Sequence, residues 1–307
     1  MGDIVMSIRD GTKRRRGMDI LSGINMEIYA GQCYGIIGEN SAGKSTIVQA
    51  ILGLIHLDRG DVSVLGFDMK RYAHMGRAHI GVVPQDDCLD GNMTILENLK
   101  VYGKLCGIGH ERASQTASKA LEEMKLERYS CVKSRETSGG VRRLAMIARA
   151  FMTSPRLIIL DEASSGLDAN KRAMLIHRVK SAVSQGCAVL MVSHLGDDLE
   201  MASTKVGILR GGLIKREYET RALLLRISGM SVYECKSGPS VRASQILDSI
   251  GIKYAETGDG VSFIRESRDR ELERILMHGG IEYTTRAVGI NDVSRHFTYL
   301  LDSGIIR

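Results

Sequence analysis

The chain has 307 residues, of which 43% are hydrophobic, and a formal net charge of +6, which is enough apolar material for one large or two ordinary domains. No apolar run approaches the ~20 residues that a membrane-spanning helix needs, and the first residues lack the layout of a secretion signal, so we expect a cytoplasmic protein. The lack of tryptophan argues against stacking platforms for single-stranded nucleic acid, and six scattered cysteines without a CxxC pair are typical of reduced thiols.

Two segments of alternating apolar and polar residues open the chain. Residues 4–9 and 18–29 have this pattern, which predicts strands with one buried face, and the Asp-Gly pair after residue 9 predicts a turn. The basic run 13–16 between them fits a solvated loop or a contact with nucleotide or anionic lipid. Residues 33–37 form a short apolar run, typical of a buried strand. We expect a small antiparallel sheet beside an α/β core.

A glycine-rich loop follows residues 33–37, and a helical pattern of apolar residues follows the loop. It matches the phosphate-binding pattern of two glycines followed by Lys and Ser or Thr, and it comprises Gly38, Glu39, Asn40, Ser41, Ala42, Gly43, Lys44, Ser45 and Thr46. Glycines let backbone N–H groups close on phosphate oxygens, and the helix points its positive end at them. We expect Lys44 to reach the terminal phosphates and the Ser45 hydroxyl to hold Mg²⁺.

Polar residues stand at the tips of three later strand-like runs. The runs cover residues 80–85, 157–160 and 188–192, and the polar residues at their tips are Gln85, Asp161, Glu162 and His194. Open α/β sheets keep their ligand groups at the carboxyl ends of the strands. Beside a phosphate loop, two carboxylates at one strand tip are expected to act on Mg²⁺ and water. Asp161 would hold the metal, and Glu162 would orient or deprotonate the attacking water.

The sequence between residues 94 and 150 changes to helical periodicity. Thr94 and Glu97 predict a capping box at the start of this region. Ser138, Gly139 and Gly140 open a further helix, and their backbone N–H groups would form a second cradle for an anion, although Ser and Gly also cap ordinary helices. These patterns predict an α/β fold, a P-loop NTPase core with an antiparallel β subdomain and a helical subdomain.

Taken together, these motifs resemble the ATP-binding subunit of ABC transporters over roughly residues 4–217. The family's own mark is a Ser-Gly-Gly helix start shortly before the strand that carries the Asp-Glu pair. The resemblance implies ATP and Mg²⁺ as cofactors. It makes Glu162 the catalytic base, places Asp161 at the metal and Gln85 at the metal or the water, and brings His194 to the γ-phosphate.

The same resemblance implies partners. Ser138 and Gly140 would contact the γ-phosphate of ATP held by a second ATP-binding subunit, and Asp168 would lie across the dimer interface. An integral-membrane permease would couple through Gln85, so the expected location is peripheral, on the inner face of the cell membrane. A homodimer is the expected assembly, and no specific nucleic acid is expected.

The sequence departs from the family pattern at three places. Ser41 replaces a glycine of the phosphate loop, and Thr137 and Val141 flank the Ser-Gly-Gly where the family has Leu and Gln. The aromatic residue that normally stacks on adenine is missing, and Arg15 or Arg16 is available instead, because a guanidinium plane can stack on a purine. We expect these changes to affect nucleotide affinity and rate rather than the fold.

The C-terminal quarter reads as a separate module. We predict an ATP-binding domain over 1–218, with a helical subdomain at about 86–154, a link at 219–230, and an accessory domain within 219–307. Its strands and helices are expected in the order βαββαβ, at 231–236, 241–250, 252–256, 260–265, 269–278 and 281–288, with a last helix at 291–301. That order suggests a small α+β ferredoxin-like domain.

Three functions compete on the sequence alone. The leading prediction is an ATPase subunit that drives a separate membrane permease, in the manner of single-domain drug or polysaccharide exporters. A soluble relative that acts on ribosomes or DNA is an alternative, although such proteins usually carry two cassettes or a long coiled-coil insert. A nucleotide sensor with little hydrolysis is the third, favoured by the departures around Ser138.

Overall fold

The structure is a computed structural model that describes residues 2–39, 42–193, 196–236, 240–257, 260–267 and 269–306. The chain divides into two compact units, Met1–Glu217 and Tyr218–Arg307. The first unit contains the phosphate-loop motifs, and the second contains the C-terminal module.

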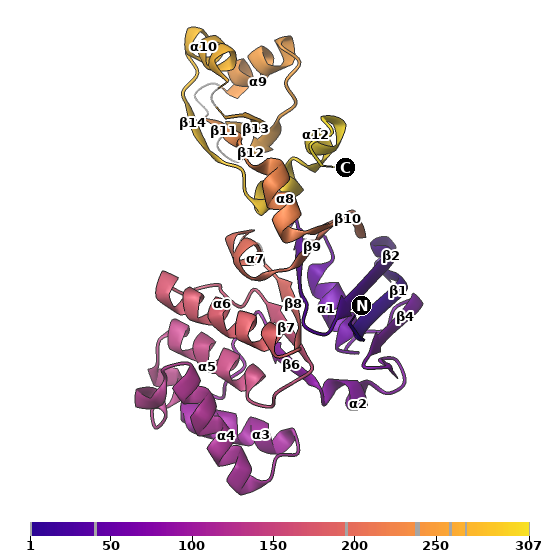
Figure 1. The fold of residues 1–307 in the computed structure, drawn as a ribbon, viewed down its shortest axis with the longest axis vertical. Helices are drawn as coiled ribbons and strands as arrows, with labels where there is room; N and C mark the ends of the chain where they lie inside the picture. The colour runs from indigo at the N-terminus through magenta and orange to yellow at the C-terminus, as the bar shows by residue number, and fades with distance from the viewer. Residues whose placement is uncertain are drawn as a thin grey trace. The chain divides into compact units, whose positions relative to one another are not determined.

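A six-stranded sheet forms the centre of the first unit (Figure 1). Its strand order is β10-β9-β3-β8-β7-β6, with bounds β3 Cys33–Gly38, β6 Ile80–Val83, β7 Leu157–Asp161, β8 Ala188–Val192, β9 Lys205–Arg210 and β10 Leu213–Glu219. The pairs β9–β3, β3–β8, β8–β7 and β7–β6 are parallel. The carboxyl ends of β3, β6, β7 and β8 therefore lie along one edge of the sheet.

A second, antiparallel sheet has the order β2-β1-β4-β5, with bounds β1 Ile4–Arg15, β2 Met18–Tyr29, β4 Arg59–Val64 and β5 Phe67–Asp68. The turn predicted after residue 9 is wrong, because β1 continues through it. The register with β2 shifts between Ile8 and Gly11, and Asp10 has a φ of 49°. A β-bulge absorbs the Asp-Gly pair, and the basic residues 13–15 consequently lie on a strand rather than in a loop.

The main core of the first unit surrounds helix α1, Lys44–Ile51. Buried side chains of α1 form one cluster with those of the antiparallel sheet and the central sheet, including Ile8, Ile24, Ile47, Ile51, Ile159 and Leu190. Helices α5, Gly139–Phe151, and α6, Ala169–Ser184, lie on the other side of the central sheet in Figure 1. Helix α1 packs between the antiparallel sheet and the central sheet, and it begins directly after the loop that leaves β3.

The helical subdomain consists of α3, α4 and α5. Helix α3 covers Ile95–Leu105 and α4 covers His110–Glu123, with 3₁₀ turns at Glu127–Tyr129 and Ser134–Glu136 before α5. The predicted capping box is confirmed, because Thr94 Oγ1 accepts from the Glu97 amide at 3.2 Å and the Glu97 carboxylate accepts from the Thr94 amide at 2.8 Å. Two short helices, α2 Ala73–Arg77 and α7 Gly196–Ala202, complete the unit.

The second unit is an antiparallel sheet with helices, in the predicted βαββαβ order. Its sheet order is β12-β13-β11-β14, and the elements are α8 Thr220–Ile227, β11 Met230–Lys236, α9 Ser240–Ser249, β12 Ala255–Thr257, β13 Gly260–Glu266, α10 Arg270–His278, β14 Tyr283–Ala287, α11 Ile290–Arg295 and α12 Phe297–Asp302. Adjacent strands are antiparallel. The rings of Tyr233 and Phe263 stack at 5.3 Å in its core.

Three predictions in this unit are wrong in detail. The supposed link contains α8, whose leucine-rich sequence favours a helix and whose Leu223 and Ile227, one turn apart, are buried. The strand at 252–256 starts only at Ala255, because the Ile252 amide bonds back to Leu247 at 2.9 Å in a turn. The last helix is divided at His296 into α11 and α12.

A polar cluster, in which the exposed Arg286 meets the buried Asp292, joins α11 to the sheet of the second unit. Arg286 donates to both oxygens of the Asp292 carboxylate, at 2.7 and 2.8 Å. His296, which is 4% exposed, lies 3.3 Å from the Ser262 hydroxyl. Burial lowers the pKa of His296 from 6.5 to about 4, against the opposing charge of Asp292. The unfolded chain therefore binds this proton more tightly than the folded one.

We expect acidification from pH 7 to pH 5 to destabilise the second unit by about 2 kcal/mol, because the contribution of neutral His296 is lost as pH falls below 6.5 toward 4. Hydrogen-exchange protection of the β11 and β13 amides, corrected for intrinsic rates, measures this. His296→Gln should reduce the change in protection between pH 7 and pH 5. Replacing the exposed His278 by Gln should leave that change as it is in the parent. Equal pH responses in the parent and His296→Gln would contradict the assignment.

Candidate nucleotide-binding and hydrolysis site

The phosphate loop connects β3 to α1, and its glycines are required by close packing. A Cβ at Gly38 would lie 2.5 Å from the Leu209 carbonyl oxygen. Gly43 has a φ of 106°, and a Cβ there would lie 2.9 Å from the Ile20 carbonyl oxygen. Only glycine fits such positions without displacing backbone. Helix α1 begins immediately afterwards, so its first N–H groups and its positive end face the space above the loop.

Lys44 extends over the loop from the first turn of α1. Its Nζ donates to the carbonyl oxygens of Gly38 at 2.6 Å and Glu39 at 3.0 Å. Burial lowers the pKa of Lys44, while the nearby carboxylates of Glu162 and Asp161 oppose that shift. The ammonium is therefore held between the loop and the acidic end of β7.

The two carboxylates at the end of β7 lie in different surroundings. Asp161 is 8% exposed, and its pKa is raised first by burial and then by the neighbouring Glu162, against the charges of Arg143 and Lys44. Glu162 is half-buried and has a φ of 53°, uncommon for a residue with a side chain. Its amide donates to Val192 at the end of β8 at 2.9 Å. The left-handed backbone turns the chain sharply at the sheet edge.

These elements enclose one cavity of about 330 Å³, a volume typical of small-molecule sites. Its walls comprise Arg15, Ile20, Gly43, Lys44, Ser45, Thr46, Gln85, Asp161 and Glu162. The fold therefore brings together the second half of the phosphate loop, the Gln after β6 and both carboxylates at the end of β7. Asn40, Ser41 and His194 lie outside the described residues.

Arg15 and Ile20 are the wall residues that the motifs do not include. Within the basic run, Lys13 pairs with Asp58 at 3.0 Å and Arg14 pairs with Asp19 at 2.5 Å. Arg15, which ends β1, lines the cavity instead. The absence of an aromatic residue for stacking on adenine pointed to Arg15 as a wall residue. Nothing in the sequence distinguished Ile20 from the other apolar residues of its strand.

Other predicted site residues gather in a separate cluster. Ser138 is the N-cap of α5 and accepts from the Val141 amide at 3.4 Å. Asp168 caps α6, accepting from the Lys171 amide at 2.9 Å, and the Lys171 ammonium lowers its pKa. The same ammonium lies beside Gly140, 3.4 Å from where a Cβ would be. Ser138, Gly139, Gly140 and Asp168 are not among the described residues that line the cavity.

A buried acid ties the loop after Glu162 to the end of β8. Asp198 is fully buried in α7 and accepts hydrogen bonds from the hydroxyls of Ser164 and Ser193, the latter at 3.5 Å. It also forms an ion pair with Arg172 of α6. Sequence reasoning did not identify Asp198, because an Asp-Asp pair at a helix start has the pattern of ordinary dipole-compensating charge.

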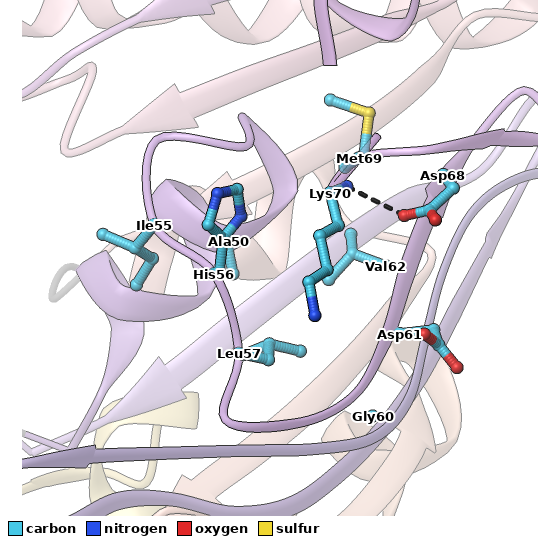
Figure 2. Close-up of a pocket in the computed structure, with 10 residues that line it drawn as sticks. All are labelled: Ala50, Ile55, His56, Leu57, Gly60, Asp61, Val62, Asp68, Met69 and Lys70. Atoms are coloured by element: carbon cyan, nitrogen blue, oxygen red, sulfur yellow. Dashed lines mark hydrogen bonds between the residues drawn. The ribbon is translucent and has the colours of Figure 1, made fainter. Parts of the chain in front are cut away.

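Two other hollows lack this chemistry. The hollow beneath the end of α1, which includes Ala50, His56, Asp61 and Lys70, measures about 20 Å³ and has room for little more than one water (Figure 2). A hollow of about 410 Å³ lies near the amino end of β7, but its Arg178 is already paired with Glu123 at 3.0 Å. Neither contains a phosphate-loop residue.

The fold and the cavity define a phosphate-loop nucleotide-binding domain. The sequence pattern described as "ABC transporter" matches residues 21–165. A "Nod factor export ATP-binding protein I" from Azorhizobium caulinodans is 39% identical over 283 residues, which is 92% of this chain and 88% of that protein. A relative of the same name from Burkholderia lata is 31% identical and covers 95% of this chain and 96% of that protein.

Solved structures show the same fold. An ATP-binding subunit of an ABC transporter superposes with a TM-score of 0.67 at 24% identity, covering 72% of this chain and 92% of that one. A dimeric cassette described as a post-hydrolysis state bound to ADP and Pi gives 0.65 at 24% identity, covering 70% and 99%. The chain belongs to the ATP-binding subunits of ABC transporters, which are ATPases. Among the described residues, no helix is long and apolar enough to cross a membrane.

We predict that Arg15 lies over the purine of bound ATP. A cation over a π face contributes up to about 2 kcal/mol, so Arg15→Ala should weaken ATP binding by up to about thirtyfold. Arg15→Tyr should preserve binding, and the loss should be similar for ATP and GTP and change little with salt. Calorimetric titration at low and high salt measures this, with Arg16→Ala as the control. Unchanged affinity in Arg15→Ala at low salt would exclude a nucleotide role.

Proposed function

We propose that the cavity between β1, α1 and β7 binds the triphosphate of ATP and hydrolyses its terminal bond. The observation that carries this proposal is that Lys44 and the carboxylates of Asp161 and Glu162 line one cavity with the start of α1. Lys44 and the loop N–H groups would hold the phosphates. Glu162, at the open turn after β7, would orient and deprotonate the attacking water, and His194 would contact the γ-phosphate.

The donor groups in the cavity fit Mg²⁺. The Ser45 hydroxyl, the Gln85 side chain and the Asp161 carboxylate all line it. In such sites Mg²⁺ binds oxygen atoms, usually those of one or two carboxylates and of the substrate phosphates. When bound, the ion supplies charge neutralisation for the phosphate oxygens. Ser45 would bind it directly, and Asp161 would do so directly or through water.

The separation of the two clusters supports a site shared between two subunits. The backbone N–H groups at Ser138–Gly140 form an anion cradle at the start of α5. Among the described residues, these three do not line the cavity of their own copy. We therefore propose that they contact the γ-phosphate of ATP bound by a second copy. Asp168, beside them through Lys171, would lie at the same interface.

The transport role follows from the relatives. Proteins named for Nod factor export match this chain over more than nine tenths of its length. We therefore propose that the chain powers export through a separate integral-membrane permease on the inner face of the cell membrane. The permease would select the substrate and would contact the loop at Gln85. The ribosome, DNA and sensor alternatives are not favoured, because the matching relatives are named as transporter subunits.

Replacing Glu162 should stop turnover while leaving nucleotide binding intact. Glu162→Gln keeps the shape of the side chain but cannot accept the proton, and general-base contributions of about a hundredfold or more are typical. Phosphate release and ATP titration measure the two properties separately. Glu122→Gln, an exposed carboxylate on α4, should match the parent. Hydrolysis by Glu162→Gln at the parental rate would assign the base to another residue.

ATP should join two copies of the Glu162→Gln protein. Its trapped nucleotide would bridge the phosphate loop of one copy and the Ser138 cradle of the other, so light scattering after gel filtration should give a dimer with ATP-Mg²⁺ and a monomer with ADP. Ser138→Glu in this background should abolish the dimer by placing a carboxylate against the phosphate, without loss of ATP binding. A monomer at saturating ATP would refute the homodimer.

A further inference from the structure

One arginine of α5 reaches across the helical subdomain to the strand ends that form the site. Arg143 follows Gly140 by one turn and is 7% exposed. Burial lowers its pKa, while the charges of Asp161 and Glu162 oppose that shift. Its side chain therefore lies inside the protein beside the catalytic carboxylates.

All five N–H groups of this guanidinium have an acceptor. Nε donates to the Ala163 carbonyl at 3.0 Å. Nη1 donates to the carbonyls of Pro84 and Gln85, at 2.7 and 3.0 Å. Nη2 donates to the carbonyls of Asp161 and Glu162, at 3.2 and 2.5 Å. The fork thus binds backbone from two segments that are far apart in the sequence.

These carbonyls lie just beyond the last paired residues of β6 and β7. The parallel register between β6 and β7 ends at Val83 and Leu160. Beyond this last pair, the segment after β6 leaves the sheet, whereas β7 stays paired with β8 through Asp161, and Glu162 then takes its left-handed conformation. Arg143 joins the two segments just beyond the last paired residues of β6 and β7.

We infer that Arg143 is a positioning residue for hydrolysis, which fixes the backbones of Gln85 and Glu162 to each other and to the helix that begins at Ser138. This inference rests on the proposed role of Glu162 as the base. Arg143 does not touch the cavity among the described residues, so it acts on the reaction through the residues that it holds.

The neighbouring arginines of α5 bind other partners. Arg142 donates to the Asp87 carboxylate at 2.6 Å and to the Thr137 carbonyl. Arg149 donates to the Cys88 carbonyl at 3.3 Å and lies over the Tyr102 ring. Only a planar fork with five donors can reach all of the acceptors of Arg143, and lysine, with three donors at one point, cannot.

The test is Arg143→Lys, which keeps the charge and the stem but not the fork. We expect kcat for ATP hydrolysis to fall at least tenfold, with KM for ATP within about twofold of the parent, because Lys44 and the phosphate loop are untouched. Arg143→Gln should show the same division between kcat and KM. The control is Arg178→Lys, a half-buried arginine that pairs with Glu123 and lies over the Phe151 ring, and it should keep the parental kcat.

The thermal midpoint of each variant separates positioning from folding. A kcat loss that matches the loss of folded protein, failure of both Arg143 variants to fold, or a parental kcat in Arg143→Lys would each overturn the inference. Glu162→Gln is assayed in parallel. Parental turnover in that variant would refute the base assignment, whereas a parental kcat in Arg143→Lys alone would refute only the role of Arg143.

Discussion

The parallel pairing of β3, β6, β7 and β8 is the constraint on which the site depends. Because these strands run the same way, their carboxyl ends meet at one edge, although the segments that follow them are separated by up to about 150 residues of sequence. The phosphate loop, Gln85, Asp161 and Glu162 are thereby placed around one cavity. The core around α1 holds this edge in place, since α1 packs against both sheets of the first unit.

The strand tips also show what sequence patterns could predict and what they could not. Asp161, Gln85 and the phosphate loop follow apolar runs bounded by glycine or proline, and those runs predict their placement. Arg143 and Asp198 could not be identified in this way, because their roles depend on acceptors and donors from other segments. The Asp-Gly pair at residues 10 and 11 occurs in turns and in bulges alike, so the sequence could not distinguish the two.

The N-terminal part of α5, which Ser138 caps, carries two groups that bear on the site. Its N-terminus presents the cradle proposed for the nucleotide of a second copy, and one turn later Arg143 holds the backbone of Glu162 in the same copy. A tilt of α5 would therefore move the backbone of Glu162 through its hydrogen bond with Arg143. In the proposed dimer, this gives a physical connection between binding at one site and the geometry of the other.

The most direct test of the account is phosphate release from ATP-Mg²⁺ by the purified full chain and its Lys44→Ala variant. Lys44 donates to the carbonyl oxygens of Gly38 and Glu39, and the charges of Glu162 and Asp161 act on its ammonium. The account predicts turnover in the parent, loss of turnover in Lys44→Ala, and parental turnover in Lys70→Ala, an exposed lysine outside the cavity. Equal rates in the parent and Lys44→Ala would contradict hydrolysis at this site.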